Sequence, residues 1–141
     1  MISNRLTVVT LGARDADALA EFYRAFGWRE AVAADGFYAF ETLGIVFTLW
    51  PLDLLADAAG LEPLPQGFRG SNIALNVDER DEVDATIEGA RAAGARITRE
   101  PTDEEWGGRS AYFTDPEENL WEVAWVPPDS EMARLVRDAR G

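Results

Sequence analysis

The chain has 141 residues, enough for a domain with a sizeable apolar core, and 47% of them are hydrophobic and 28% charged, as in a soluble globular protein. Its 26 acidic and 13 basic residues give a formal charge of −13, which argues against nucleic acid or an anionic membrane as a partner. Cysteine, histidine and lysine are absent, so thiol, imidazole and Schiff-base chemistry and Cys- or His-ligated metal sites are excluded. The acidic surface is compatible with a cationic ligand, although it also serves solubility.

The sequence shows neither an apolar leader nor a run of about 18 apolar residues. We therefore expect a cytoplasmic protein without a membrane partner.

Apolar alternation and turn residues predict a strand, a helix and a three-strand meander in the first half of the chain. Asp15 and Asp17 supply a cap and first-turn acid for the helix, and Gly27 ends it. The predicted strands are Arg5 to Leu11, Trp28 to Ala33, Phe37 to Glu41 and Ile45 to Trp50, with the helix running to Phe26.

The second half repeats this order after a connector, Pro51 to Arg69, in which Leu52 to Ala59 can form a short helix. We predict strands at Gly70 to Val77, Ala95 to Thr98, Arg109 to Phe113 and Leu120 to Val126, a helix from Asp78 or Asp81 to about Ala93, an acidic loop at Pro101 to Gly108, and a terminal helix at Ser130 to Arg140.

The repeated order predicts an α+β fold of two tandem βαβββ modules whose curved mixed sheets enclose a cavity. Within a single domain 1–141, module one spans about 5–50, the connector about 51–69, module two about 70–127 and the C-terminal helix about 130–140.

One carboxylate stands out in the closing strand. Alternation places Trp121, Val123 and Trp125 on the core face, whereas Glu122 lies on the other face beside Leu120 and Ala124. A carboxylate in a strand otherwise built for burial requires a partner, a ligand or an open cavity. Asp115, Pro116 and Asn119, which precede this strand, are interpreted as a structural turn.

This organisation resembles the vicinal oxygen chelate superfamily, which includes glyoxalase I, extradiol dioxygenases and bleomycin-resistance proteins. The resemblance covers Arg5 to Pro127. It rests on the closing segment from Tyr112 to Trp125, on Gly12-Ala13-Arg14-Asp15 leading into Phe22-Tyr23 and Gly27, and on the strand Asn72-Ile73-Ala74-Leu75-Asn76-Val77-Asp78.

Metal-dependent members of that family place one ligand on each of four strands. The equivalent positions here are Val8, Thr48, Asn72 and Glu122, of which only Glu122 is a metal-binding type. We therefore expect no tight metal site and no cofactor.

The remaining candidates face the predicted cavity. Glu122 is a candidate general base or anchor for a ligand cation, or else a relic carboxylate bonded to Asn72 or Thr48. Asn72 and Asn76 share a strand face and suit ligand hydrogen bonding, or satisfy each other. Trp106 lies between two acids and two glycines, where it either stacks on a ligand from a mobile loop or plugs the core.

Thr48 and Trp50 complete the candidate binding set, as residues of the wall of the cavity. Arg109 is a candidate partner for a ligand carboxylate, although a surface pair with the acids at 104 and 105 is favoured.

Three functions follow from this pattern. The first is a metal-independent binding protein that holds a small, partly aromatic ligand, as the bleomycin-resistance branch does. The second is a metal-free lyase or isomerase that uses Glu122 as its base, so whether the chain is an enzyme stays open. The third is a metal-dependent glyoxalase or dioxygenase with unusual ligands. The family pattern also implies a homodimer, while the ligand itself cannot be read from the sequence.

Overall fold

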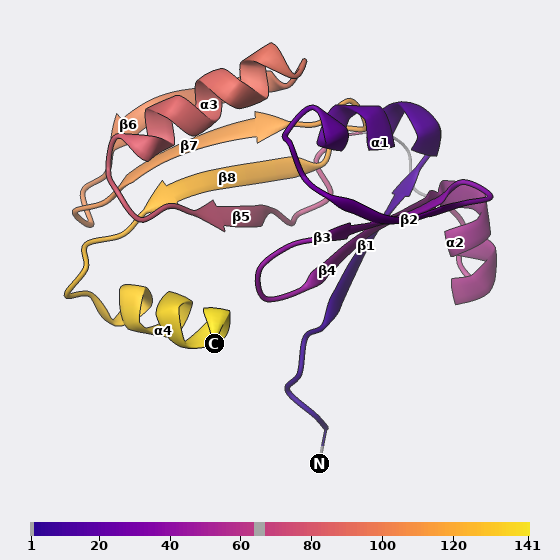
Figure 1. Cartoon of the computed structure of the whole chain (residues 1–141), viewed down its shortest axis with the longest axis horizontal. Helices are drawn as coiled ribbons and strands as arrows, with labels where there is room; N and C mark the ends of the chain where they lie inside the picture. The colour runs from indigo at the N-terminus through magenta and orange to yellow at the C-terminus, as the bar shows by residue number, and fades with distance from the viewer. Residues whose placement is uncertain (1, 64–66) are drawn as a thin grey trace. The chain divides into compact units, whose positions relative to one another are not determined.

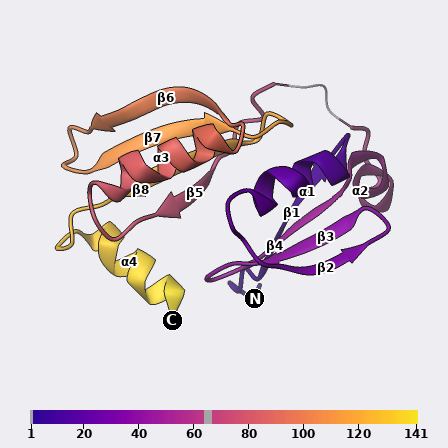
Figure 2. The same cartoon turned by 45° about the horizontal axis from the view of Figure 1, so that its top comes forward.

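The computed structural model describes residues 2–63 and 67–141, which form two compact units, Met1–Pro65 and Gln66–Gly141. Each unit contains a four-stranded mixed sheet with a helix on one face (Figure 1, Figure 2). The α+β fold and the repeated β-α-β-β-β order predicted from the sequence are confirmed. In the described part of the chain, no helix combines the length and apolarity needed to cross a membrane.

The first unit has the sheet order β1-β4-β3-β2. Strand β1 runs parallel to β4, and the other neighbours are antiparallel. The elements are β1 (Val8–Ala13), α1 (Ala16–Arg24), β2 (Glu30–Ala34), β3 (Phe37–Glu41), β4 (Val46–Pro51) and α2 (Leu52–Ala59).

Helix α1 begins where the sequence predicts, because the Asp15 carboxylate accepts a hydrogen bond of 2.9 Å from the Ala18 amide. Its buried face packs on one side of the sheet through an aromatic cluster. The Tyr23 ring lies 4.8 Å from Phe47 of β4 and is stacked 5.5 Å from Trp28. Leu19 and Tyr23 are fully buried, which places the core of this unit between α1 and the sheet.

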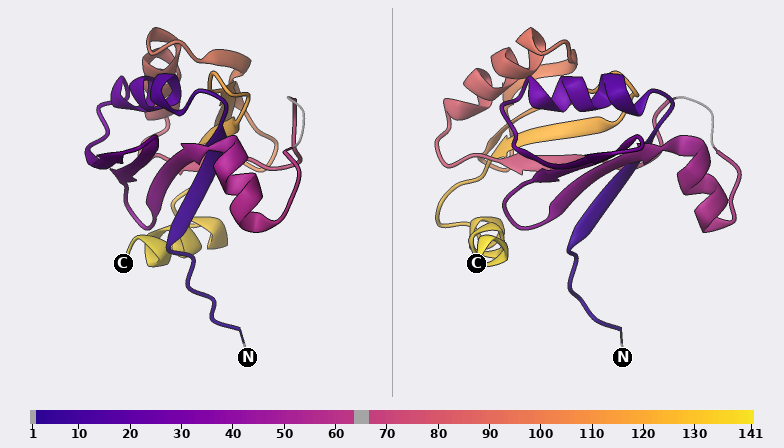
Figure 3. Two further views of the ribbon diagram at one scale, coloured as in Figure 1. Left: turned by 90° about the vertical axis from the view of Figure 1, so that its right-hand side faces the viewer. Right: turned by 45° about the vertical axis from the view of Figure 1, so that its right-hand side comes forward.

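Helix α2 packs against β1 and β4 (Figure 3). Gly12 of β1 makes this approach possible. A Cβ atom added there would lie 2.8 Å from Leu52 Cδ1 and 3.2 Å from Leu55 Cδ2. The predicted short helix at Leu52 to Ala59 is therefore confirmed. It can lie this close to β1 because Gly12 has no side chain.

The second unit has the order β5-β8-β7-β6, with β5 parallel to β8. Helix α3 contacts β6, β7 and β8 and covers one face of this sheet. The elements are β5 (Ile73–Asn76), α3 (Glu82–Ala92), β6 (Arg96–Asp103), β7 (Arg109–Thr114), β8 (Leu120–Trp125) and α4 (Glu131–Arg140).

Two local predictions in this unit change. Strand β6 continues through Pro101 to Asp103 instead of ending at Thr98, because two register irregularities in its pairing with β7 accommodate the extra residues. Pro101 is tolerated there because β6 is an edge strand. Helix α3 follows Asp81, but this side chain makes no capping bond. Instead, Glu82 reaches back to the amides of Asp78 and Glu79.

The turn between β7 and β8 is structural, as predicted. Asp115 is 4% exposed, and its Oδ1 accepts hydrogen bonds of 2.9 Å from the amides of Glu117 and Asn119. Its Oδ2 accepts from Asn119 Nδ2 at 2.8 Å. This side chain fixes the five-residue turn and therefore the register of β7 against β8.

Candidate functional site

Glu122 lies on the sheet face opposite α3, as strand alternation predicts. Its neighbours in β8, Trp121 and Val123, are buried on the α3 side, where Phe113 stacks on Trp121 at 6.1 Å. We call the other side the open face of the second sheet. It is defined by Ala74 and Asn76 of β5, Arg99 of β6, Ser110 and Tyr112 of β7, and Glu122 of β8.

The partner of Glu122 is Tyr112, directly opposite it in the antiparallel β7–β8 ladder. The Tyr112 hydroxyl donates a hydrogen bond of 2.5 Å to Glu122 Oε2. This bond to a carboxylate, together with burial, raises the pKa of Tyr112 to about 12. In the described part of the chain, Glu122 Oε1 accepts no hydrogen bond from the protein, so this oxygen is available to a ligand.

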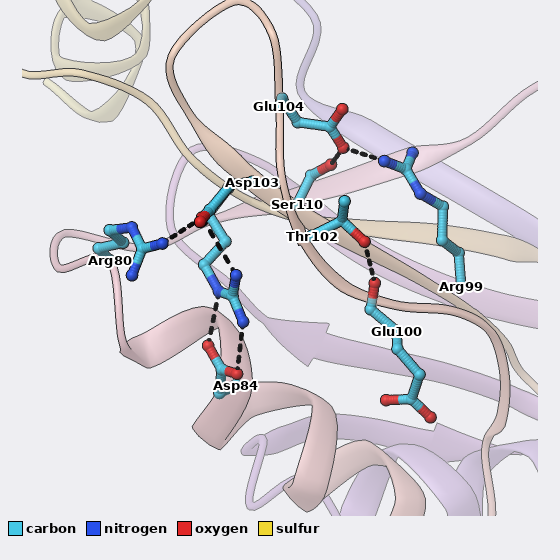
Figure 4. A network of polar contacts seen from close by, with 9 residues as sticks. Arg80, Asp84, Arg99, Glu100, Thr102, Asp103, Glu104 and Ser110 are labelled. Atoms are coloured by element: carbon cyan, nitrogen blue, oxygen red, sulfur yellow. Dashed lines mark hydrogen bonds and ion pairs between the residues drawn. The ribbon is translucent and has the colours of Figure 1, made fainter.

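A second polar group lies on the same face, beside the first. The Arg99 guanidinium lies over the Tyr112 ring, 5.8 Å from its centroid, and forms an ion pair with Glu104. The Ser110 hydroxyl donates a hydrogen bond of 2.6 Å to the same carboxylate oxygen, Glu104 Oε1. Figure 4 shows Arg99 and Ser110 converging on Glu104.

Asp103 and Glu104, which are adjacent in sequence, leave the chain in different directions (Figure 4). Asp103 pairs with Arg80 and Arg109, and Arg109 binds both carboxylate oxygens of Asp84 on α3 at 2.8 Å. The prediction that Arg109 pairs with the acids at 104 and 105 is therefore wrong, and Glu104 forms its ion pair with Arg99 instead. The β6–β7 hairpin is held by charged contacts on both of its faces.

Trp106 occupies the tip of that hairpin. The turn is closed by the Glu104 amide donating to Gly108 O at 2.9 Å and the Gly107 amide donating to Glu104 O at 3.0 Å. A Cβ atom added at Gly108 would lie 1.9 Å from Trp106 Cζ3, so the indole fills the place of the missing side chain. The indole is 55% exposed and so does not plug the core.

The other predicted ligand residues are placed as follows. Asn72 precedes β5 and is exposed, and Asn76 Nδ2 donates to Ala124 O at 3.4 Å. Thr48 and Trp50 lie in β4 of the first unit, where Thr48 Oγ1 is 2.6 Å from Thr10 Oγ1. Within the second unit, the hydrogen-bond partner of Glu122 is Tyr112 and not Asn72. The alternative that pairs Glu122 with Thr48 of the first unit stays a prediction.

The donors at the four family metal positions do not fit a metal ion. Val8 has no donor and is 54% exposed, the Thr48 hydroxyl is engaged with Thr10, and Glu122 is engaged with Tyr112. Within residues 2–63 and 67–141, no three His, Cys, Asp or Glu side chains form a group that could hold a metal. We therefore derive no chemistry through a metal.

Sequence reasoning missed Arg99, Ser110 and Tyr112. Tyr112 could have been found by counting. A five-residue turn from Asp115 to Asn119 places Thr114 opposite Leu120, and hence Tyr112 opposite Glu122. The sequence could not have identified Arg99, because the sheet face on which its side chain lies depends on the irregular register between β6 and β7.

Two βαβββ units, each a four-stranded mixed sheet with a helix packed on one face, define the class of protein. The chain belongs to the glyoxalase/bleomycin resistance protein/dioxygenase superfamily, whose family model matches residues 5–123. The family predicted from the sequence is therefore confirmed. A comparison with curated proteins found no match.

Solved structures with this fold include enzymes and a resistance protein. A glyoxalase-related enzyme from Fulvimarina pelagi is 29% identical, with a TM-score of 0.80 over 89% of this chain and 90% of that one. A glyoxalase/bleomycin resistance protein/dioxygenase from Nocardioides is 27% identical, with a TM-score of 0.76 over 92% and 89%. A fosfomycin resistance protein from Mesorhizobium loti is 24% identical, with a TM-score of 0.64 over 96% and 99%, and shows the fold alone.

Proposed function

We propose that this protein binds a small, partly aromatic molecule on the open face of the second sheet, without a metal. One observation carries the proposal. Glu122 is a partly buried carboxylate with one oxygen held by Tyr112 at 2.5 Å and the other without a protein donor. A half-satisfied carboxylate beside an aromatic ring suits a ligand that brings its own donor and a flat apolar surface.

The surrounding residues support binding by preorganisation. Tyr112 fixes the Glu122 carboxylate, and Ser110 and Arg99 fix Glu104, so two of the acidic groups are oriented before a ligand arrives. Fixing polar groups in advance reduces the entropy that binding costs. Trp106 adds an exposed aromatic surface at the hairpin tip.

The second candidate is a metal-free lyase or isomerase, favoured by the same pair of residues. Glu122 Oε1 would accept a proton from the substrate, and the Tyr112 hydroxyl would remain protonated near neutral pH because its pKa is about 12. Under this alternative, Glu122→Gln abolishes turnover, whereas a ligand still binds. The superfamily is named for glyoxalases, bleomycin resistance proteins and dioxygenases together, so membership does not choose between binding and catalysis.

Calorimetric titration against a panel of aromatic metabolites and drugs tests the proposal. We expect at least one ligand to bind the wild type, and Glu122→Gln and Tyr112→Phe to weaken that ligand about tenfold or more, which corresponds to about 1.4 kcal/mol. Glu88→Gln is the matched control, because it removes a carboxylate from α3 on the covered side of the sheet. Equal weakening by Glu88→Gln and Glu122→Gln would contradict the proposed site.

We also propose that the protein is a homodimer. Val8, Val32 and Val46 are each at least 44% exposed, and apolar strand residues of this kind suit a subunit interface. Light scattering across a dilution series tests this, and a monomer at every concentration would contradict it.

A further inference from the structure

The open face of the second sheet already holds a cation supplied by the chain itself. The Arg99 guanidinium lies 5.8 Å from the centre of the Tyr112 ring and pairs with Glu104. The Arg99 contacts therefore indicate that this face can bind a planar positive group against a carboxylate and an aromatic ring.

The two members of this ion pair differ in how they are held. The Glu104 side chain is 16% exposed and is also bonded to Ser110, which is 2% exposed. The Arg99 side chain is 44% exposed, and Glu104 is its single ion-pair partner among the described residues. The Glu104 carboxylate is thus fixed on the sheet face, whereas the Arg99 guanidinium can rotate out into solvent at little cost in free energy.

The aromatic surface is adapted to a cation. Because the Tyr112 hydroxyl donates a hydrogen bond to Glu122, electron density shifts toward the phenol oxygen and ring, which strengthens the attraction of the ring for positive charge. Gly108 directly precedes β7, the strand that carries Ser110 and Tyr112, and the Trp106 indole fills the space above Gly108. A second half-exposed aromatic ring therefore lies at the hairpin tip next to this strand.

We propose that this face is a subsite for an organic cation that carries an amidinium or guanidinium group on a flat ring, and that Arg99 is its internal competitor. The inference rests on the proposed function and names the ligand class for that site. An incoming cation takes the place of Arg99 against Glu104 and Tyr112, while its ring contacts Trp106. Two carboxylates, Glu104 and Glu122, against one arginine oppose an anionic ligand.

The test uses benzamidine, which is cationic near neutral pH, and benzamide, its neutral near-isostere, titrated calorimetrically into the full chain. We expect benzamidine to bind the wild type more tightly than benzamide. Arg99→Gln should then raise the affinity for benzamidine at least fivefold and leave that for benzamide unchanged. Glu104→Gln should remove the preference for benzamidine. Arg91→Gln is the control, since it changes the net charge equally but on α3, which covers the opposite face of the sheet.

Several outcomes would overturn the inference. Equal affinity gains for Arg99→Gln and Arg91→Gln would mean that only the net charge matters. If Arg99→Gln binds benzamidine no better than the wild type, Arg99 does not compete with the ligand and the inference fails. Arg99→Met serves as a second variant if Arg99→Gln loses its thermal transition. If benzamidine binds no more tightly than benzamide while another ligand depends on Glu122, the cation subsite is refuted and the proposed function stands. If no ligand depends on Glu122, the proposed function itself is refuted.

Discussion

The hydroxyl of Tyr112 and the carboxylate of Glu122 form a hydrogen bond of 2.5 Å between directly opposed residues of β7 and β8. The two side chains project from the face that α3 leaves uncovered, beside Arg99 and Glu104. This pair couples the aromatic and acidic features of the candidate site, so its disruption should be detectable by several measurements.

The first prediction concerns the acidity of Tyr112. Glu122→Gln replaces a charged acceptor with a neutral one, so the pKa of Tyr112 should fall from about 12 toward 10. Because the folded pKa of Tyr112 is raised above the ordinary tyrosine value of 10.0, the stability from this pair is fully present below pH 10 and is lost between pH 10 and about 12. Ultraviolet titration of phenolate in the two proteins measures the shift. An identical titration curve in Glu122→Gln would contradict the hydrogen bond.

The second prediction concerns the charged contacts of the β6–β7 hairpin. Arg109 binds Asp84 and Asp103, its side chain is 17% exposed, and its hydrogen bonds lower the pKa of both carboxyls. Arg109→Gln should reduce the free energy of unfolding by about 1 to 2 kcal/mol, since it removes a bidentate charge-assisted contact. Denaturant unfolding measures this loss.

The pH dependence of the free energy of unfolding provides a control for the Arg109→Gln experiment. Because the contacts with Arg109 lower the pKa of Asp84 and Asp103 below the ordinary aspartate value of 3.8, they stabilise the fold above about pH 3.8. This contribution is lost as the pH falls below that value. Arg109→Gln should therefore differ most from the wild type near neutral pH and least in acid. Arg134→Gln on the exposed face of α4 should change stability far less than Arg109→Gln.

The third prediction compares two glycines. A methyl group at Gly12 would lie 2.8 Å from Leu52 Cδ1 and 3.3 Å from Leu52 Cα, so Gly12→Ala should displace α2 and destabilise the protein by about 1 to 3 kcal/mol. At Gly89, inside α3, nothing lies within 4 Å of the added atom. Gly89→Ala should therefore stabilise the protein by about 0.5 to 1 kcal/mol. Thermal unfolding of both variants checks the opposite signs, and a loss of stability in both would contradict this account.

The fourth prediction concerns the turn that sets the β7–β8 register. Asp115→Ala removes the acceptor of two backbone amides and of Asn119 Nδ2 in a buried place, which should cost about 2 to 4 kcal/mol. Asp115→Asn keeps an oxygen for the two amides and should cost less. If both variants unfold at the same denaturant concentration, the backbone bonds are not what holds the turn.

The sequence alone determined features that depend on neighbours along the chain. The cap at Asp15, the turn at Asp115 and the short helix at Leu52 to Ala59 follow from local chemistry, and the structure confirms them. Strand alternation also placed Glu122 on the face opposite Trp121 and Val123, since that periodicity is a property of any extended chain.

Only the tertiary structure decided which side chains meet on that face. Arg109 could have paired with any nearby acid, and its partners Asp84 and Asp103 were selected by the packing of α3 against β6 and β7. Arg99 reaches Glu104 and Tyr112 because β6 is irregular and extends beyond its predicted end. Partner choice between strands depends on register, and one residue of slip sends every side chain to the other face. For this reason the sequence identified the acidic residue at the centre of the candidate site, whereas the fold supplied its partners.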